Sequence, residues 1–455
     1  MEKFDIAIVG SGPGGYVAAL YAARSGCKVA LIEKGLPGGT CLNRGCIPTK
    51  VYLESARVLG EIAGAGLFGI ETAAPRIDLQ KLLARKNETV ARLRQGVETL
   101  ISARSIAFIN GTATFVSSTL LDVAGRRIEA GKIIIATGSA PQQIASVPFD
   151  HLKIISSDDA LELREIPQRL LVVGGGAIGC EFASIYHSFG SRVSIVEAAQ
   201  EILPGVDREI AKKAALGFKR RGISIFSGTT LVRTADAGSS IEAEFLNGER
   251  LIVDKILVSI GRRPVIDGLA LENAGVRIEN GSIIVDEHMR TSVENIYAIG
   301  DVTGRHQFAH VASYEALIAV DHCRGRDARA DYAAVPYCVY ADPEIAGVGV
   351  TEERAKELKL DYKVARFPFS ALGKAHIAGK TDGTLKLIGE RSTGRLLGVH
   401  IIGAQATAMI AEAVVAIKNK MTVESLSRTI HAHPTFPEAL LEAAHIFNDA
   451  GIHVL

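Results

Sequence analysis

Short aliphatic runs recur along the chain, and glycines end most of them. The first run, at 4–9, reads FDIAIV and predicts a buried strand. It leads into the glycine turn GSGPGG at 10–15, and the alanine-rich segment 16–24 that follows predicts a helix. A second aliphatic run at 28–32 ends in Glu33. The order strand, glycine turn, helix and strand predicts a βαβ unit.

The glycine turn and the acid after the second strand are typical of a dinucleotide site. Gly10 permits a tight turn, Gly12 lets a pyrophosphate approach the backbone, and Gly15 lets helix and strand pack closely. The phosphates would bind at the positive N-terminus of the helix. Glu33 would accept hydrogen bonds from the adenosine ribose.

The same unit returns in the middle of the chain. The strand LLVV leads into GGGAIG, whose turn glycines are Gly174, Gly176 and Gly179, and the next strand ends in Glu197. Two dinucleotide sites suggest a flavin and a nicotinamide that exchange a hydride, because no protein side chain performs hydride chemistry. Two alanines, rather than arginines, follow Glu197, which favours NAD over NADP.

Each unit closes with an aliphatic strand, a glycine and a proline. The closing segments read IIIATGSAP, from residue 133, and ILVSIGRRP, from residue 256, and a later buried run, YAIGD, ends in Asp301. The simplest topology inserts the second nucleotide domain into the first, after which the chain returns to finish it. From residue 335 the pattern changes to hairpin strands, an apolar helix at 404–418 and the run HAHPTFPE.

A chain of 455 residues is too long for one compact core, and these patterns divide it. We expect an α/β chain with two Rossmann-like dinucleotide-binding domains and a C-terminal α+β domain. The expected boundaries are 1–145 for the first part of the first nucleotide domain, 146–265 for the inserted one, 266–334 for a central domain that completes the first site, and 335–455 for the C-terminal domain.

Composition and charge mainly exclude classes of function. A formal net charge of +1 gives no electrostatic reason to expect nucleic acid or an anionic membrane as a partner, and the absence of tryptophan argues against a base-stacking surface. The apolar run at the N-terminus is too short for a signal peptide, and no run reaches the ~18 to 20 residues that cross a bilayer. We expect a cytoplasmic protein.

Two cysteines, Cys41 and Cys46, lie five positions apart in GGTCLNRGCIPTK. A zinc site would need a second matched pair of ligands, which the chain does not offer. In a regular helix, residues five apart have Cα atoms roughly 8.5 Å apart, whereas a disulfide tolerates less than about 7 Å. Bonding the pair therefore needs a distorted turn, which Gly45 can supply, and strain of that kind suits a redox-active disulfide.

The position of the pair supports this interpretation. It follows the first ribose-binding acid by a few residues, so the next helix could lie across a flavin with a cysteine at its positive end, where the thiolate is favoured. The four other cysteines stand alone in apolar contexts and are interpreted as core packing: Cys27, Cys180, Cys323 and Cys338.

The combination of GSGPGG, GGTCLNRGCIPTK, IIIATGSAP, GGGAIGCE, SIGRRP, YAIGD and HAHPTFPE resembles the pyridine nucleotide-disulfide oxidoreductases over about 4–444. The resemblance implies an FAD domain, an inserted NAD domain, a central domain and a dimer-interface domain. It implies FAD contacts at Gly10, Gly12, Gly15, Glu33, Thr40, Lys50, Ala113, Thr137, Asp301 and Ala309, and NAD contacts at Gly174, Gly176, Gly179, Glu197 and Gly261.

The resemblance also implies catalytic roles. Cys41 and Cys46 would form the redox-active disulfide, and Lys50 would lie by the flavin and pair with Glu181. His433 would be the acid–base residue that accepts the substrate's thiol protons, with Glu438 orienting its ring, and His431 is its nearest rival. The block that holds the histidine would complete the active site of a second copy, so a homodimer is implied.

The implied activity is the oxidation of protein-bound dihydrolipoyl groups with reduction of NAD⁺ to NADH. The partner would be a lipoylated carrier protein of a 2-oxoacid dehydrogenase complex or of the glycine cleavage system. Alternatives are another disulfide or quinone reductase of the same family, or an FAD-binding redox-sensing or scaffold protein with little turnover. Three positions depart from the family pattern: Arg44, Tyr314 and Pro437.

Overall fold

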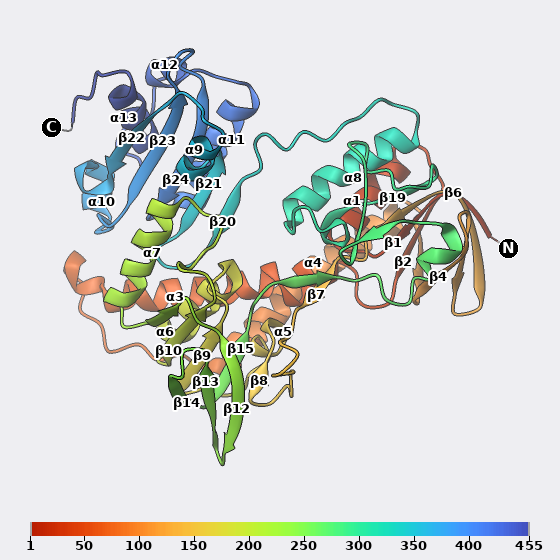
Figure 1. Ribbon diagram of the computed structural model, residues 1–455, viewed down its shortest axis with the longest axis horizontal. Helices are drawn as coiled ribbons and strands as arrows, with labels where there is room; N and C mark the ends of the chain where they lie inside the picture. The colour runs from red at the N-terminus through yellow and green to blue at the C-terminus, as the bar shows by residue number, and fades with distance from the viewer. Residues whose placement is uncertain (1, 454–455) are drawn as a thin grey trace. The chain divides into compact units, whose positions relative to one another are not determined.

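The computed structural model describes residues 2–453 and divides the chain into two compact units (Figure 1). Each unit is built from three separate stretches of the chain, and we describe the two units one at a time. The first consists of the stretch up to Val51, Gln80–Gln142 and Gly261–Asp331, and the second of Tyr52–Leu79, Gln143–Ile260 and the stretch from Tyr332. The finer division into four domains stays a prediction.

A seven-stranded sheet forms the centre of the first unit, in the order β3-β2-β1-β6-β5-β4 with β19 also paired to β6. The pairs among β3, β2, β1, β6 and β19 are parallel, whereas β4 and β5 extend the sheet as an antiparallel hairpin. The bounds are β1 Glu2–Val9, β2 Val29–Glu33, β3 Ala107–Asn110, β4 Ala113–Ser117, β5 Leu120–Val123, β6 Arg126–Ile135 and β19 Ile296–Ala298. The pairing of β19 with β6 confirms that the chain returns to the first sheet after an insertion.

Helix α1 (Pro13–Arg24) packs along α8 (Ala309–Cys323) beside this sheet. Small residues permit the close approach, since Ala18 and Ala22 are fully buried and a Cβ on Gly14 would lie 3.3 Å from the carbonyl oxygen of Ala312. The unit also contains α2 Gly39–Arg44, α4 Leu79–Ala103, the 3-10 turn η3 Gly300–Thr303 and the antiparallel pair β7 Ser139–Pro141 with β16 Arg262–Pro264. Helix α3, Cys46–Ala63, begins in this unit.

The second unit contains a five-stranded parallel sheet in the order β11-β10-β9-β15-β8. Its strands are β8 Ile154–Ile155, β9 Arg169–Val173, β10 Arg192–Glu197, β11 Ser224–Ser227 and β15 Lys255–Val258. Helices α5 Ser157–Ala160, α6 Ala177–Ser188 and α7 Arg208–Arg220 accompany it, as does the antiparallel sheet β12 Leu231–Ala237, β13 Ser240–Phe245 and β14 Arg250–Val253. The burial of residues 170–173 of β9 explains the unbroken aliphatic run of this repeat.

A second, antiparallel sheet in this unit follows the order β20-β21-β24-β23-β22. Its strands are β20 Tyr337–Val339, β21 Ile345–Gly349, β22 Tyr362–Pro368, β23 Thr384–Glu390 and β24 Leu396–Ile402. The helices beside it are α9 Glu352–Glu357, α10 Gly373–Ile377, α11 Ala406–Lys418, α12 Val423–Ser427 and α13 Glu438–Phe447. The expected hairpin and the expected helix are both present, the helix beginning two residues later than predicted.

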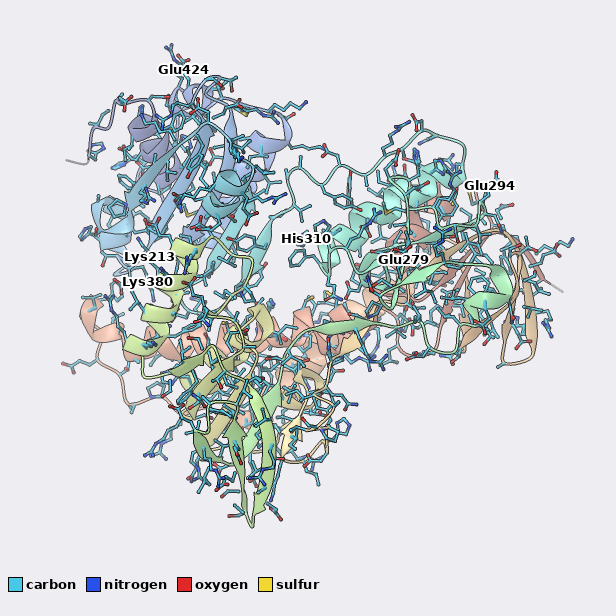
Figure 2. The ribbon with its side chains drawn as sticks, in the orientation of Figure 1. Lys213, Glu279, Glu294, His310, Lys380 and Glu424 are labelled. Carbon is cyan, nitrogen blue, oxygen red and sulfur yellow. The ribbon has the colours of Figure 1, made fainter. Side chains whose placement is uncertain are left out.

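Charged side chains of both signs lie on the surface, as a net charge near zero leads one to expect. Figure 2 labels five of them, all exposed: Lys213, Glu279, Glu294, Lys380 and Glu424. Within residues 2–453, no helix combines the length and the apolar character needed to cross a membrane.

Candidate active site

The first glycine turn has a conformation that side chains would block. Gly10 has a φ of +102°, and a Cβ there would lie 2.3 Å from the carbonyl oxygen of Ala136. A Cβ on Gly15 would lie 1.8 Å from the carbonyl oxygen of Gly10. By contrast, a Cβ on Gly12 would meet no atom within 4 Å, so open space lies in front of its backbone. Gly10 therefore permits the tight turn, Gly15 permits close packing, and Gly12 leaves room for a ligand, as in a dinucleotide-binding turn. We call such a turn, with the acid at the end of the next strand, a dinucleotide cradle.

Glu33 lies at the end of β2, beside this turn. Its Oε2 accepts hydrogen bonds from the backbone N–H of Ser11 at 2.7 Å and from the Ser11 hydroxyl at 2.8 Å, while Oε1 accepts from Gly35 N–H at 2.8 Å. These three donors hold the carboxylate in place. A carboxylate oxygen has lone pairs to spare, so the same group can accept a ribose hydroxyl.

The second glycine turn repeats this geometry. Gly174 also has a φ of +102°, and Cβ atoms on Gly174 and Gly179 would lie 2.5 Å and 1.9 Å from the carbonyl oxygens of Ser259 and Gly174. A Cβ on Gly176 would again meet no atom within 4 Å. Glu197 accepts from the backbone N–H of the residue 22 positions earlier, as Glu33 does, and the second turn is therefore a second cradle.

The remaining predicted flavin residues of the first unit lie on several different elements. Thr137 follows β6 and donates through its hydroxyl to the carbonyl of Val265 at 2.6 Å. Asp301 lies on η3 after β19 and accepts a hydrogen bond from the Ser139 hydroxyl, and burial raises the pKa of its carboxyl group. Ala309 is the first residue of α8, Ala113 the first of β4, and Thr40 lies on α2.

Three polar residues that support Asp301 were not assigned from the sequence. Arg262 donates from Nε to the Ser139 hydroxyl at 2.7 Å, and this hydroxyl in turn donates to Asp301. Glu315 is completely buried and accepts from the backbone N–H of Gly300 at 2.6 Å, which holds the turn that presents Asp301. The signal that points to Glu315 is an acid placed within the mainly apolar stretch 311–320 of helix α8, VASYEALIAV.

The cysteine segment contains the distortion that the spacing requires. Helix α2 ends at Arg44, Gly45 has φ −136° and ψ −110°, and α3 begins at Cys46. A Cβ on Gly45 would lie 3.0 Å from the carbonyl oxygen of Thr40 and 3.3 Å from Cα of Cys41. The glycine therefore brings the first helix close to the start of the second. Cys46 occupies the N-terminal position of α3, as predicted.

Cys41 and Cys46 are both free thiols in this structure, and the disulfide between them stays a prediction. A hydrogen bond with Cys46, together with burial, raises the pKa of the Cys41 thiol, and the charge of Lys50 opposes this effect. The two thiols are therefore in direct contact with each other.

The cysteine segment also lies directly against the first glycine turn. A Cβ on Gly39, the first residue of α2, would lie 2.6 Å from Cα of Gly12, and the backbone N–H of Gly38 donates to the carbonyl of Ser11 at 3.0 Å. The first cradle and the thiols therefore belong to one local structure. A dinucleotide bound along Gly12 would lie beside the cysteine pair.

Lys50 lies on α3 one turn after Cys46, and Glu181 lies on α6 in the other unit. The Glu181 carboxylate accepts from the backbone N–H of Tyr340 at 3.0 Å. The pairing of Lys50 with Glu181 stays a prediction. Gly261 precedes β16 with a φ of +126°, which favours glycine at this position.

The histidine block contains a His–Glu pair. Nδ1 of His433 lies 2.8 Å from Oε1 of Glu438, whose other oxygen accepts from the backbone N–H of Thr435 at 2.6 Å. Pro437 adopts a helical conformation immediately before α13, so this departure from the family pattern leaves the contact intact. The rival, His431, is engaged elsewhere: its side chain is only 6% exposed, and Nε2 lies 2.9 Å from Glu412, whereas the His433 side chain is 78% exposed.

Two dinucleotide cradles, one of them carrying a cysteine pair, define a two-nucleotide thiol–disulfide oxidoreductase. The chain belongs to the pyridine nucleotide-disulphide oxidoreductase family, whose model matches residues 4–316, and residues 335–444 match the dimerisation domain of that family. The α/β fold, the family and the assignment as an FAD-containing, pyridine nucleotide-linked oxidoreductase are thereby confirmed.

Curated relatives match over the whole chain. The dihydrolipoyl dehydrogenase of Chlamydia muridarum is 41% identical, with 100% of this chain and 98% of the relative covered. The dihydrolipoyl dehydrogenase of Thermus scotoductus is 42% identical, with 100% of both covered. Among solved structures, the Cu(II) complex of the HOCl-induced flavoprotein disulfide reductase RclA from Escherichia coli is 31% identical, with a TM-score of 0.89, 98% of this chain and 100% of that chain covered.

Proposed function

We propose that the chain is a dihydrolipoyl dehydrogenase, which oxidises protein-bound dihydrolipoyl groups and reduces NAD⁺ to NADH. The observation that carries the proposal is the break at Gly45, which brings Cys41 against Cys46 beside the first dinucleotide cradle. The full-length relatives of that name support the choice of substrate. FAD in the first cradle would accept two electrons from the reduced cysteine pair and deliver them as a hydride to NAD⁺.

The thiol chemistry follows from the side chains. His433 would remove a proton from one substrate thiol, and the resulting thiolate would attack Sγ of Cys41 in the oxidised pair. The Cys41–Cys46 bond breaks, a mixed disulfide forms, and Cys46 leaves as a thiolate at the positive end of α3. The second substrate thiol then attacks the substrate sulfur of the mixed disulfide, and the bond from that sulfur to Cys41 breaks. The lipoyl disulfide is released, and the proton of the second thiol passes to Cys41, so that Cys41 ends as a thiol and Cys46 as a thiolate.

The two cradles would divide the nucleotides between them. The residues proposed to hold FAD are Gly10, Gly12, Gly15, Glu33, Thr40, Lys50, Ala113, Thr137, Asp301 and Ala309, and those proposed for NAD are Gly174, Gly176, Gly179, Glu197 and Gly261. Glu181 would pair with Lys50 beside the flavin. The open space in front of Gly12 and Gly176 supports nucleotide binding at both turns. The Glu197 carboxylate would repel the 2′-phosphate of NADP, which supports NAD at the second turn.

We propose that the enzyme acts as a homodimer, in which the histidine block of one chain serves the cysteines of the other. The family's dimerisation domain and the apolar surface beside His433 support this, since Ile430 is 98% exposed and Val415 on α11 is also exposed. Exposed apolar side chains of this kind are typical of a surface that binds another protein chain. The substrate would arrive on a lipoylated carrier protein of a 2-oxoacid dehydrogenase complex or of the glycine cleavage system, in the cytoplasm.

The test is NADH formation from dihydrolipoamide and NAD⁺ by the purified FAD-containing protein. Steady turnover that Cys46→Ser abolishes supports the proposal. A quinone or diaphorase-type reductase would instead oxidise NADH with a quinone as acceptor and retain that activity in the variant. Flavin binding with no turnover on either substrate would identify the chain as a scaffold or redox sensor.

A further inference from the structure

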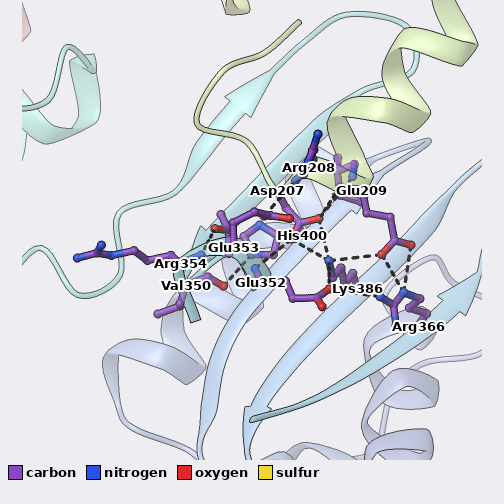
Figure 3. A network of polar contacts seen from close by, with 12 residues as sticks. Asp207, Arg208, Glu209, Val350, Glu352, Glu353, Arg354, Arg366, Lys386 and His400 are labelled. Carbon is purple, nitrogen blue, oxygen red and sulfur yellow. Dashed lines mark hydrogen bonds and ion pairs between the residues drawn. The ribbon is translucent and has the colours of Figure 1, made fainter. Parts of the chain in front are cut away.

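A buried ion cluster in the second unit connects the second nucleotide cradle to the antiparallel sheet (Figure 3). Nζ of Lys386, on β23, lies 3.0 Å and 2.9 Å from the two carboxylate oxygens of Asp207 and 2.8 Å from Glu352. The side chains of Lys386 and Asp207 are 1% and 0% exposed. A buried pair of this kind contributes little net stability compared with apolar residues of the same size, so its value lies in fixing one arrangement.

Asp207 depends on this lysine for its charge balance. Glu352 has a second cation in Lys356, at 2.9 Å, and Glu209 has Arg366, at 2.8 Å. Among the residues that the structure describes, Lys386 is the cation within ion-pair distance of Asp207. Removing Lys386 would therefore leave the Asp207 carboxylate buried and unbalanced, whereas the two glutamates would keep a partner.

The Asp207 carboxylate also holds the start of α7. It accepts from the backbone N–H groups of Glu209 at 3.1 Å and Ile210 at 3.4 Å, and its other oxygen accepts from the N–H of Glu352 at 3.2 Å. One carboxylate thus joins the first turn of α7, the first turn of α9 and the lysine of β23. The position of Asp207 is set from three directions.

The segment 198–206, between Glu197 and Asp207, lies on the second glycine turn. The backbone N–H of Leu203 donates to the carbonyl of Gly175 at 2.7 Å, and a Cβ on Gly175 would lie 2.8 Å from a methyl group of Ile202. Gly175 N–H in turn donates to the Glu197 carboxylate at 2.6 Å. A continuous set of contacts therefore runs from the lysine cluster to the residues that would bind the nucleotide.

We propose that Lys386 is a positioning residue for the pyridine nucleotide: by holding Asp207, it fixes the segment 198–206 against Gly175 and presets the second cradle and Glu197 for binding. The inference rests on the proposed role of the second cradle as the NAD site. Lys386 itself touches no nucleotide. Because Lys386 keeps this segment ordered before the nucleotide binds, the free energy of binding is not reduced by the cost of ordering it.

The test compares Lys386→Met with Lys356→Met, because both lysines contact Glu352 but only Lys386 reaches Asp207. We expect Lys386→Met to weaken NADH binding, measured by titration, about tenfold and to speed hydrogen exchange at Leu203 and Val206 about tenfold or more. Flavin content and flavin reduction by dihydrolipoamide without nucleotide should match the wild type. Lys356→Met should leave all four measurements within about twofold.

A second variant keeps the inference testable if Lys386→Met alone does not fold. Lys386→Met combined with Asp207→Asn removes the unbalanced charge while keeping a side chain that can cap α7. If this double variant folds and still binds NADH weakly, positioning is supported. Wild-type NADH affinity in either Lys386 variant would overturn the inference. If the wild type binds NADPH and not NADH, the NAD assignment fails, and the same comparison made with NADPH still tests the role of Lys386.

Discussion

The carboxylate of Glu438 lies 2.8 Å from Nδ1 of His433, and a backbone N–H from Thr435 holds its other oxygen. In the role proposed for His433, this contact would orient the imidazole so that Nε2 is the atom that exchanges protons with substrate. Two residues earlier, His431 is held by Glu412 instead. The local fold therefore pairs the two neighbouring histidines with different carboxylates and leaves His433 the more exposed, which supports its proposed acid–base role.

Glu438→Gln is expected to lower kcat for NADH formation by roughly 10²-fold, because the neutral amide no longer stabilises the protonated imidazole. Flavin content and the melting temperature should change little. The matched control is Glu412→Gln, which removes the carboxylate that contacts His431. Equal losses in the two variants would contradict the assignment of His433.

Gly45→Ala is expected to disrupt the cysteine pair without removing the flavin. The new Cβ would lie 3.0 Å from the carbonyl oxygen of Thr40 and 3.3 Å from Cα of Cys41, so the end of α2 would have to shift by a few tenths of an ångström and change the contact between the thiols. We expect at least a tenfold loss of dihydrolipoamide oxidation. Gly60→Ala, in the middle of α3, is the control because its Cβ would meet no atom within 4 Å. That change should stabilise the helix by about 0.5–1 kcal/mol.

Gly12→Ala and Gly176→Ala should each impair the binding of a different nucleotide. The φ values are −64° and −72°, which alanine adopts without strain, and both Cβ atoms would enter open space. Both variants should therefore fold. We expect Gly12→Ala to lose FAD during purification, and Gly176→Ala to keep FAD with a KM for NAD⁺ raised about tenfold or more. Loss of FAD from Gly176→Ala would contradict the division of the cradles.

Low pH should reduce the free energy of unfolding, partly because the Glu352 carboxylate becomes protonated. Burial opposes ionisation, but hydrogen bonds from Lys386 and Lys356 lower the pKa of Glu352 to about 2 from its ordinary value of 4.5. A lowered folded pKa adds stability that is present above the unfolded pKa and is lost as the pH falls toward the folded value. Between pH 6 and pH 3, Glu352 should account for a loss of about 2 kcal/mol.

Urea unfolding of wild type and Glu352→Gln at both pH values checks this figure. The free energy of unfolding of the variant should fall by about 2 kcal/mol less than that of the wild type over this range. Parallel losses in the two proteins would show that Glu352 does not carry the effect.

The elements that the sequence predicted well are those with local signals. The glycine turns, the aliphatic strands and the acids Glu33 and Glu197 lie within one βαβ unit each, so their spacing alone indicates their geometry. The His433–Glu438 contact also spans only a few residues and was expected. The break at Gly45, which lets Cys41 approach Cys46, was also predicted, and a disulfide between these two cysteines stays a prediction.

The contacts that were missed join residues far apart in the chain. Lys386 and Asp207 are separated by 179 positions, and Arg262 and Ser139 by 123. No periodicity or motif indicates which buried lysine meets which buried acid, because that choice depends on how separate layers pack.

The amino-acid sequence alone established the two nucleotide cradles, the thiol pair and the histidine block, since each rests on backbone geometry and side-chain chemistry within a short stretch of chain. Packing of distant segments decided how those parts are supported: Glu315 on α8 fixes the turn of Asp301, and Lys386 on β23 fixes Asp207. The physical reason is that a buried charge must find its partner in three dimensions, and only the folded chain shows which partners are within reach.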